Sequence, residues 1–143
     1  MILLNSASYA QITYEQNYNA AVKKAQTSRK PIFILLNPKG SVKVANKKGL
    51  NGPEATLLYD TNFVNLKLTA GEPDATLMGS LFNITATPSY IFINSDQKIL
   101  FKWHGAKTEE KFFIEIGKEV LDRLEKGTTL FDFDQKYENG EIS

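Results

Sequence analysis

The spacing of apolar residues predicts that the chain opens with a helix and a buried strand. From Tyr14 to Arg29, apolar side chains recur at helical spacing, which indicates an amphipathic helix. Pro31 and an unbroken apolar run over residues 32–36 follow at once. Such a run is typical of a strand that is covered on both faces by helices. The pattern therefore predicts an α/β domain built on a central sheet.

The middle of the chain carries a second helix–strand unit. Residues 41–48 are predicted to form a helix with Ser41 as its N-cap, which breaks at 49–52 and restarts at Pro53. Alternating apolar and polar residues over 62–68 predict the next strand. Because a helix separates this strand from the first one, we expect the two strands to be parallel.

The second half predicts a short helix, a hairpin and a long final helix. Asp74 is expected to cap the short helix, with Leu77, Met78 and Leu81 on its apolar side. Two apolar runs joined by a short turn predict an antiparallel hairpin. Thr108 is expected to be the N-cap of the final helix. The hairpin strands are expected over residues 89–93 and 98–104.

Composition limits the chemistry that this chain can perform. Of its 143 residues, 17 are basic and 16 acidic, which gives a net charge of +1, and there is one histidine and no cysteine. A nearly neutral chain has no global field to attract nucleic acid, and no apolar stretch is long enough for a helix to insert into a membrane. Without cysteine there is no thiol catalysis and no thiolate metal site, so neither a metal nor another cofactor is expected.

A small basic cluster falls in the predicted helix after the first strand. It consists of Lys43, Lys47 and Lys48 and contains no interleaved aromatic residue. Surfaces that bind single-stranded nucleic acid combine both kinds of side chain. We interpret the cluster as the solvated face of the helix, with an anion site as the alternative.

Four segments of the chain together resemble bacterial thioredoxin-like proteins. They are KPIFILL, FVNLKL, TATPSYIFI and DQKILFKWHG, in this order. The resemblance implies a thioredoxin-like three-layer sandwich, in which a central mixed β-sheet is flanked by helices. We divide the chain accordingly into an N-terminal segment (1–13), a thioredoxin-like domain (14–126) and a C-terminal extension (127–143).

The Cys-x-x-Cys pair of that family is missing from this chain. The resemblance places the two positions on Ser41 and Val44. Thiol–disulfide exchange needs a thiolate as nucleophile and a sulfur as leaving group, and a serine and a valine supply neither. A Ser41 nucleophile would need a base, and the single histidine, His104, lies far along the chain. We therefore expect no thiol–disulfide oxidoreductase activity and assign no catalytic residue.

Thr87 and Pro88 carry the functional hypothesis. In thioredoxin-like proteins the proline is cis and the backbone of the preceding residue pairs with an extended peptide, and the resemblance maps these roles onto Thr87 and Pro88. A proline that only shapes the loop is the alternative. We expect a redox-inactive module in which Ser41, Thr87 and Pro88 bind a peptide or partner protein. Trp103 is expected in the core or against the hairpin face, and His104 at the surface.

Three other classes of function stay open, one of which is a thioredoxin-like domain that binds lipid in a large apolar pocket. An enzyme with non-thiol chemistry would need paired carboxylates, for which Glu54, Asp60 and Asp74 are candidates. A structural domain of a longer exported protein is the third. The first ten residues resemble the end of a secretory signal cleaved after Ala10, which predicts a periplasmic or exported protein. Without a signal, the chain would stay in the cytoplasm.

Overall fold

The computed structural model describes residues 11–40 and 46–127 of the chain. Ser41 and Val44, the predicted positions of the missing cysteines, lie outside these ranges. The signal-like start and the residues after 127 also lie outside them, so cleavage after Ala10, export and a C-terminal extension stay predictions.

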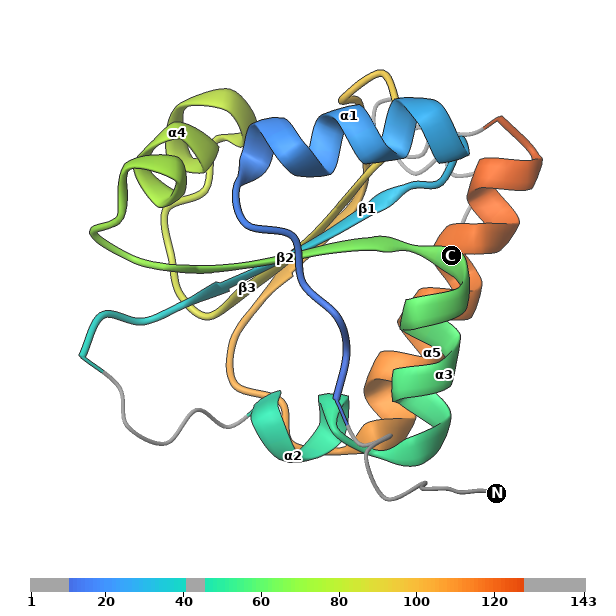
Figure 1. Cartoon of the computed structure of the whole chain (residues 1–143). Helices are drawn as coiled ribbons and strands as arrows, with labels where there is room; N and C mark the ends of the chain where they lie inside the picture. The colour runs from blue at the N-terminus through green and yellow to red at the C-terminus, as the bar shows by residue number, and fades with distance from the viewer. Residues whose placement is uncertain (1–10, 41–45, 128–143) are drawn as a thin grey trace, which may run out of the picture.

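A four-stranded mixed sheet forms the centre of the molecule (Figure 1). Strand β1 (Ile32–Asn37) pairs in parallel with β2 (Val64–Thr69) and antiparallel with β3 (Ser89–Ile93). Strand β4 (Ile99–His104) pairs antiparallel with β3, which gives the order β2-β1-β3-β4. The predicted parallel pair and the predicted hairpin are both confirmed.

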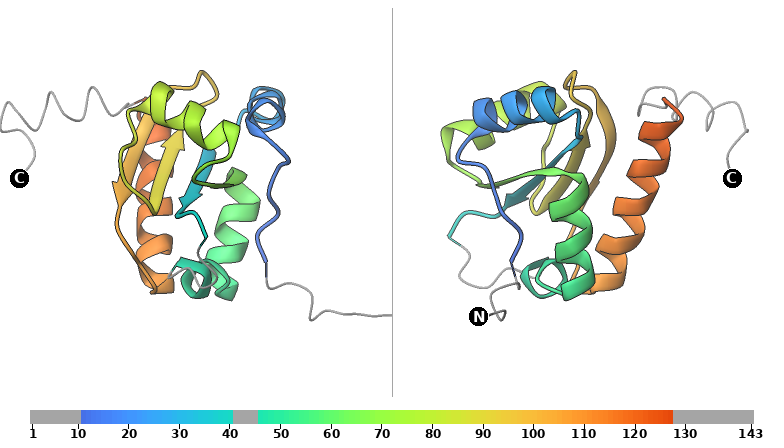
Figure 2. Two further views of the ribbon diagram at one scale, coloured as in Figure 1. Left: turned by 90° about the vertical axis from the view of Figure 1, so that its left-hand side faces the viewer. Right: turned by 45° about the vertical axis from the view of Figure 1, so that its right-hand side comes forward.

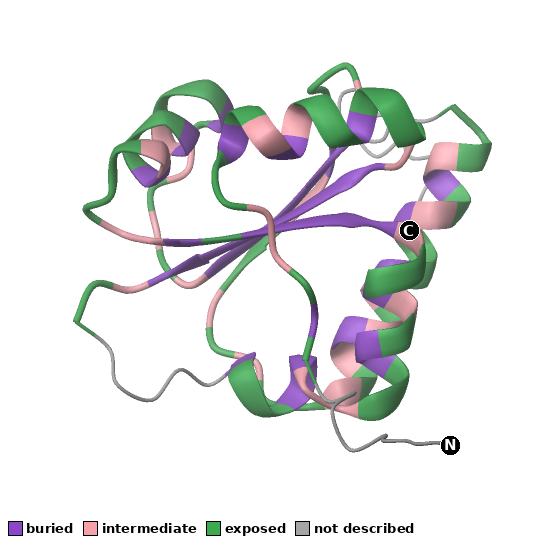
Figure 3. Ribbon diagram, viewed as in Figure 1, coloured by how far each residue is buried: buried purple, intermediate pink, exposed green. Residues whose placement is uncertain are grey.

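Helices cover both sides of the sheet, so the molecule has three layers (Figure 2). Helices α1 and α4 contribute buried residues to the cluster on one side, and α2, α3 and α5 contribute to the cluster on the other. Strands β1, β2 and β3 between them are almost entirely buried, whereas most of β4 is only partly buried or exposed (Figure 3). The five helices are α1 (Tyr18–Ser28), α2 (Asn46–Leu50), α3 (Pro53–Asn62), α4 (Pro73–Phe82) and α5 (Glu110–Glu125).

The side of the sheet under α1 and α4 is called the aliphatic face here. Every hydrophobic strand residue buried on it is aliphatic, and alternate positions of each strand point the same way. Small residues of α1, Ala21 and Ala25, let that helix approach the strands closely, and both are fully buried. The strand residues of this face are Ile32, Ile34, Leu36, Val64, Leu66, Leu68, Ile91 and Ile93.

The opposite side, under α3 and α5, is called the aromatic face. The ring of Phe33 lies with its centroid 4.8 Å from that of Tyr59 and 4.9 Å from that of Phe92. Phe63 and Phe113 extend this cluster along α3 and α5. Tilted and edge-to-face pairs of this kind add about 0.5–1.5 kcal/mol each beyond the area that they bury.

One carboxylate links the two helices on each face of the sheet. Asp74 of α4 accepts the backbone N–H of Tyr18 at the start of α1, at 2.8 Å. Glu110 of α5 accepts the N–H groups of Glu54 and Ala55 at the start of α3, at 2.9 and 3.0 Å. A carboxylate in this position satisfies free donors and interacts favourably with the helix dipole.

The predicted caps of α4 and α5 were wrong. Asp74 lies inside α4 and accepts an N–H group at the start of α1. Glu72 occupies the N-cap position of α4, and Pro73 lies in its first turn. At α5 the N-cap is Glu109 instead of Thr108, and it makes no side-chain capping bond.

The first predicted helix starts later than its apolar spacing suggests. Asn17 caps α1 by accepting the N–H of Ala20 at 2.8 Å, so Tyr14 lies before the helix. The preceding segment crosses in front of β2 (Figure 1), where the N–H of Glu15 donates to the carbonyl of Asn65 at 2.8 Å. Ile12, placed before the predicted domain, is buried in the cluster of the aromatic face. Tyr14 fits the helical spacing of the sequence, but it packs on the aromatic face of the sheet, whereas α1 packs on the aliphatic face.

Two details of α2 and α4 also differ from the prediction. Gly49 does not break the helix; it belongs to α2, where an added Cβ would lie 2.9 Å from the ring of Phe113. On α4 the buried residues include Met78, but Leu77 and Leu81 are exposed. An apolar stripe read at helical spacing gives no indication of which side the sheet will cover.

Candidate functional site

The candidate site is the loop from Asn83 to Pro88, which joins α4 to β3. Asn83 ends α4 in a left-handed conformation, with φ 55°, and its N–H donates to the carbonyl of Gly79. At the other end, Ser89 Oγ donates to the carbonyl of Ala86, and the N–H of Gly105 donates to the carbonyl of Pro88 at 2.9 Å. The Thr87–Pro88 peptide bond is cis. The loop is therefore anchored at both ends by α4 and by the hairpin.

The backbone of Thr87 is unpaired within the described part of the chain. Its N–H and carbonyl take part in no hydrogen bond there, and the residue is exposed. The ladder between β1 and β3 ends one step away, where Leu36 pairs with Ser89. Thr87 thus presents a free donor and acceptor just beyond the end of the sheet.

A hollow of about 370 Å³, called the groove here, lies on one side of this loop. Its walls come from the first turns of α4, from the connection between β2 and α4, and from the loop itself. Most of the lining is small or aliphatic, with Ala70, Ala75, Gly79 and Ile84 as examples. The groove can therefore accept a modest apolar side chain, but it offers no charged group.

A second hollow of about 330 Å³ lies on the other side of the same loop. Residues Ile84, Thr85 and Ala86 line both hollows, so the loop forms the ridge between them. The far wall of the second hollow comes from β4 and includes Lys102, whose Nζ donates to the carbonyl of Phe82 at 3.3 Å. A chain lying along the ridge would have a hollow on either side.

Trp103 and His104 belong to the second hollow rather than to the core. The Trp103 side chain is 42 % exposed, and its ring centroid lies 5.9 Å from that of Phe112 on α5. Lys107 Nζ lies 5.2 Å from the Trp103 ring, in cation–π geometry. His104 is exposed, as predicted. The sequence could not reveal that both residues line a hollow next to Thr87.

The carboxylates proposed for an alternative enzyme are kept apart by the fold. Asp60 accepts the N–H of Thr13 at 2.9 Å, Asp74 accepts the N–H of Tyr18 at the start of α1, and Glu54 lies in the first turn of α3. None of the three lines the groove or the second hollow. Within the described residues, no group of three or more histidine or carboxylate side chains could hold a metal ion.

Of the predicted site residues, Thr87 lines the groove and Pro88 follows it directly after the ridge, while Ser41 falls outside the described residues. Sequence reasoning missed the partners of the ridge, above all Gly71, Ala75 and Gly79. The only sequence signal for them was their small size, which many other positions share. No helix in the described ranges has the length and hydropathy needed to cross a bilayer.

Comparison with solved structures shows a thioredoxin-like fold. DsbH oxidoreductase is similar over 83% of this chain and 92% of its own, with a TM-score of 0.65 and 13% identity. A thioredoxin from Thermus thermophilus is similar over 80% of this chain and 89% of its own, with a TM-score of 0.67 and 15% identity. The C-terminal domain of Neisseria meningitidis DsbD in its reduced form covers 71% of this chain and 91% of its own, with a TM-score of 0.53 and 20% identity.

No protein-family model matches the sequence, and no curated protein matches it. At such low identity, the structural likeness shows the fold alone. The fold predicted from the sequence, a mixed sheet flanked by helices in a thioredoxin-like arrangement, is confirmed. The chain has this fold without any cysteine.

Proposed function

We propose that this chain is a redox-inactive thioredoxin-fold module that binds an extended segment of a partner protein along the ridge at Thr87. The observation that carries the proposal is the unpaired backbone of Thr87, which lines the groove and directly follows the ridge between the two hollows. Addition of an extended peptide to a free sheet edge is a recurrent mode of recognition, in which backbone hydrogen bonds provide affinity.

The two hollows supply the specificity that such pairing needs. Successive side chains of an extended peptide point to opposite sides, so neighbouring residues would enter the groove and the second hollow in turn. The groove, with Ala75 and Gly79 in its wall, suits a small aliphatic side chain. The second hollow, with Trp103 in its wall, suits a flat or long one.

The absence of cysteine separates this proposal from an oxidoreductase. A chain with no cysteine cannot form the mixed disulfide through which thiol–disulfide exchange proceeds. Peptide docking needs only backbone groups and shape, so it can persist without that chemistry. We include the predicted periplasmic or exported location in this proposal, which cell fractionation of the native host would test.

The experiment blocks the groove without touching the ridge. Peptides are selected on the full chain from a display library of short random sequences, and their affinities are then compared on two variants. Gly79→Leu places a large side chain in the groove, where a Cβ would lie 3.5 Å from the carbonyl of Ile84, an ordinary contact. Ser80→Leu is the matched control, since Ser80 is exposed on the same helix and lines neither hollow.

We expect Gly79→Leu to weaken the selected peptides by at least about tenfold, the equivalent of about 1.4 kcal/mol. Ser80→Leu should leave affinity within about twofold, in the range of a neutral surface change. Equal affinity for both variants, or a library that yields no enriched peptide, would refute the proposal. Thermal unfolding of each variant verifies that the fold is intact.

A further inference from the structure

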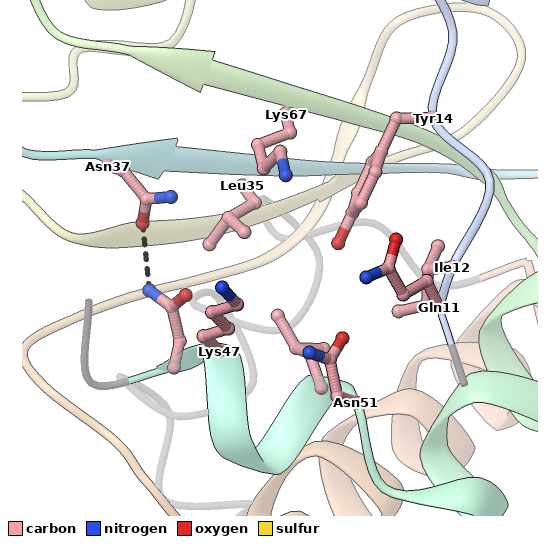
Figure 4. Close-up of a pocket in the computed structure, with 10 residues that line it drawn as sticks. Gln11, Ile12, Tyr14, Leu35, Asn37, Lys47, Asn51 and Lys67 are labelled. Carbon is pink, nitrogen blue, oxygen red and sulfur yellow. Dashed lines mark hydrogen bonds between the residues drawn. The ribbon is translucent and has the colours of Figure 1, made fainter. Parts of the chain in front are cut away.

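A third hollow lies on the aromatic face, at the end of the sheet that α3 and α5 leave uncovered. Its volume is about 270 Å³, and its walls come from the segment before α1, the ends of β1 and β2, and α2 (Figure 4). It shares no lining residue with the groove. Leu35 lines this hollow, whereas its neighbour Leu36 lines the groove from the other face of the sheet.

The hollow lies at the ends of β1 and β2, as the position of Lys67 shows. Lys67 pairs in register with Leu35 and points to the aromatic face, but it is exposed where Asn65, two residues earlier, is buried. The carboxyl ends of β1 and β2 meet here because the two strands are parallel. Crevices at the carboxyl ends of strands are the general ligand-binding location of α/β sheets.

Two ammonium groups from separate elements converge on the hollow. The side chains of Lys67 from β2 and Lys47 from α2 both point into it (Figure 4). Neither lysine forms an ion pair with any described carboxylate, and no acidic side chain is among the residues that line the hollow. The two positive ammonium groups repel each other, and an anion bound between them would be attracted by both.

Neutral hydrogen-bonding groups complete the lining. The Tyr14 hydroxyl and the side-chain amides of Gln11 and Asn51 point toward the same space as the lysines (Figure 4). Burial, together with the charge of Asp60, raises the pKa of Tyr14 well above its ordinary value. The hydroxyl of Tyr14 therefore stays a hydrogen-bond donor at neutral pH. Asp60 itself does not line the hollow and accepts the N–H of Thr13.

Two buried amide side chains, those of Asn37 and Asn46, form part of the wall of the hollow. Asn46 lines the hollow and is 1 % exposed, and its Nδ2 donates to Oδ1 of Asn37 at 2.9 Å. Its own Oδ1 has no hydrogen-bond partner. Buried polar atoms in native proteins are nearly always paired. This oxygen is itself buried, so a molecule in the hollow could reach it only if the wall of the hollow moved.

We infer that this hollow binds a small hydroxylated organic anion, with its carboxylate or phosphate group between Lys47 and Lys67. The hydroxyl groups of the ligand then meet the side-chain amides of Gln11 and Asn51 and the hydroxyl of Tyr14. The inference does not depend on the proposed peptide groove, since the two sites lie on opposite faces of β1.

Calorimetric titration of the full chain with three probes tests the ligand class. Citrate and glycerol 3-phosphate distinguish the two acid groups, and glycerol is the neutral control. We expect at least one acid to bind with a dissociation constant below about 1 mM at low salt, and added salt should weaken it because salt screens exposed charges. Glycerol should not bind. Failure of both acids to bind below about 10 mM would overturn the inference.

Three lysine variants then test the place of binding. Lys67→Gln and Lys47→Gln should each weaken the acid that binds by about tenfold, since hydrogen bonds to charged groups are the strong ones. Lys48→Gln is the matched control, because Lys48 is exposed on α2 beside Lys47 but does not line the hollow. It should change affinity by less than about twofold. An equal loss for all three variants would indicate non-specific attraction and overturn the assigned site.

Peptide binding gives a further readout that separates the two proposals. Lys67→Gln should leave the affinity of groove-selected peptides unchanged, and Gly79→Leu should leave acid binding unchanged. Loss of both activities in Lys67→Gln, with the fold intact, would contradict the independence of the two sites.

Discussion

The two faces of the sheet solve the same packing problem with different residues. Aliphatic strand residues meet the small side chains of α1 on one face, whereas interlocking rings fill the space under α3 and α5 on the other. Each face also ends in its own kind of hollow. The aliphatic face ends at a groove with no charged lining, and the aromatic face ends at a hollow lined by two lysines and four side-chain amides.

The difference shows how one strand can serve two unrelated surfaces. Because side chains alternate along β1, Leu35 lines the lysine-lined hollow and Leu36 lines the groove on the opposite face. The groove offers backbone groups and shape, which suits an extended chain. The lysine-lined hollow offers charge and hydrogen bonds, which suits a small anion. Substitutions that separate the two faces therefore test the comparison directly.

Truncation of a ring on the aromatic face should have the largest effect. Phe92 is fully buried and its ring centroid lies 4.9 Å from Phe33 and 5.4 Å from Phe63. We expect Phe92→Ala to lower the free energy of unfolding by about 3–5 kcal/mol, measured by urea denaturation. Its neighbour Ile91 points to the aliphatic face, and Ile91→Val should cost only about 0.5–1.5 kcal/mol. Comparable losses of unfolding free energy in the two variants would show that the aromatic face is not packed more tightly than the aliphatic face.

Two buried tyrosine hydroxyls offer a matched comparison of the faces. Tyr59 donates to the carbonyl of Phe113 at 2.7 Å on the aromatic face, and Tyr18 donates to Oε1 of exposed Gln97 at 2.6 Å on the aliphatic face. Tyr59→Phe leaves a buried carbonyl without its partner, so we expect a loss of about 1–3 kcal/mol in urea denaturation. Tyr18→Phe leaves only a group that water can reach, and should cost about 0.5 kcal/mol. A larger loss of unfolding free energy for Tyr18→Phe than for Tyr59→Phe would contradict the environments assigned to the two hydroxyl groups.

Removal of the carboxylate that links helices should also cost more stability on the aromatic face than on the aliphatic face. Glu110 accepts two N–H groups of α3, whereas Asp74 accepts one at α1, where Asn17 also caps. We expect Glu110→Ala to lower the unfolding free energy by about 1–2 kcal/mol and Asp74→Ala by about 0.5–1 kcal/mol. The control is Glu109→Ala, because Glu109 makes no capping bond, and it should be nearly neutral. Thermal unfolding monitored by circular dichroism is sufficient.

Alkaline pH should reveal a smaller, gradual effect. Burial raises the pKa of Tyr18 to about 12, so the folded chain keeps a proton that the unfolded chain releases near pH 10. The stability from this group is complete below pH 10 and declines as pH rises from there toward 12. Tyr18→Phe removes this contribution, so its unfolding free energy should fall less steeply than that of the parent across this range. An unchanged slope would refute the environment assigned to Tyr18.

The prediction of the site rested on one local segment and stays a prediction. Thr87 and Pro88 were assigned from TATPSYIFI, which is contiguous in the chain, and the strand predicted to follow them is present and fully buried. The groove walls were missed, since Ala70, Gly79 and Leu36 come from three separate elements. Lys47 was recognised as basic, but its convergence with Lys67 depends on the pairing of β1 with β2 and on the position of α2.

Local pattern alone determined the order of helices and strands, the parallel and antiparallel pairs, and the exclusion of thiol chemistry. Hydrophobic period and the length of a connection act between near neighbours, so a sequence contains them directly. Only the tertiary structure decided that Asp74 and Glu110 serve other helices, that Leu77 and Leu81 stay exposed, and that two lysines share a hollow. Each of these depends on which surfaces meet, and contacts between distant segments exist only once the chain has folded.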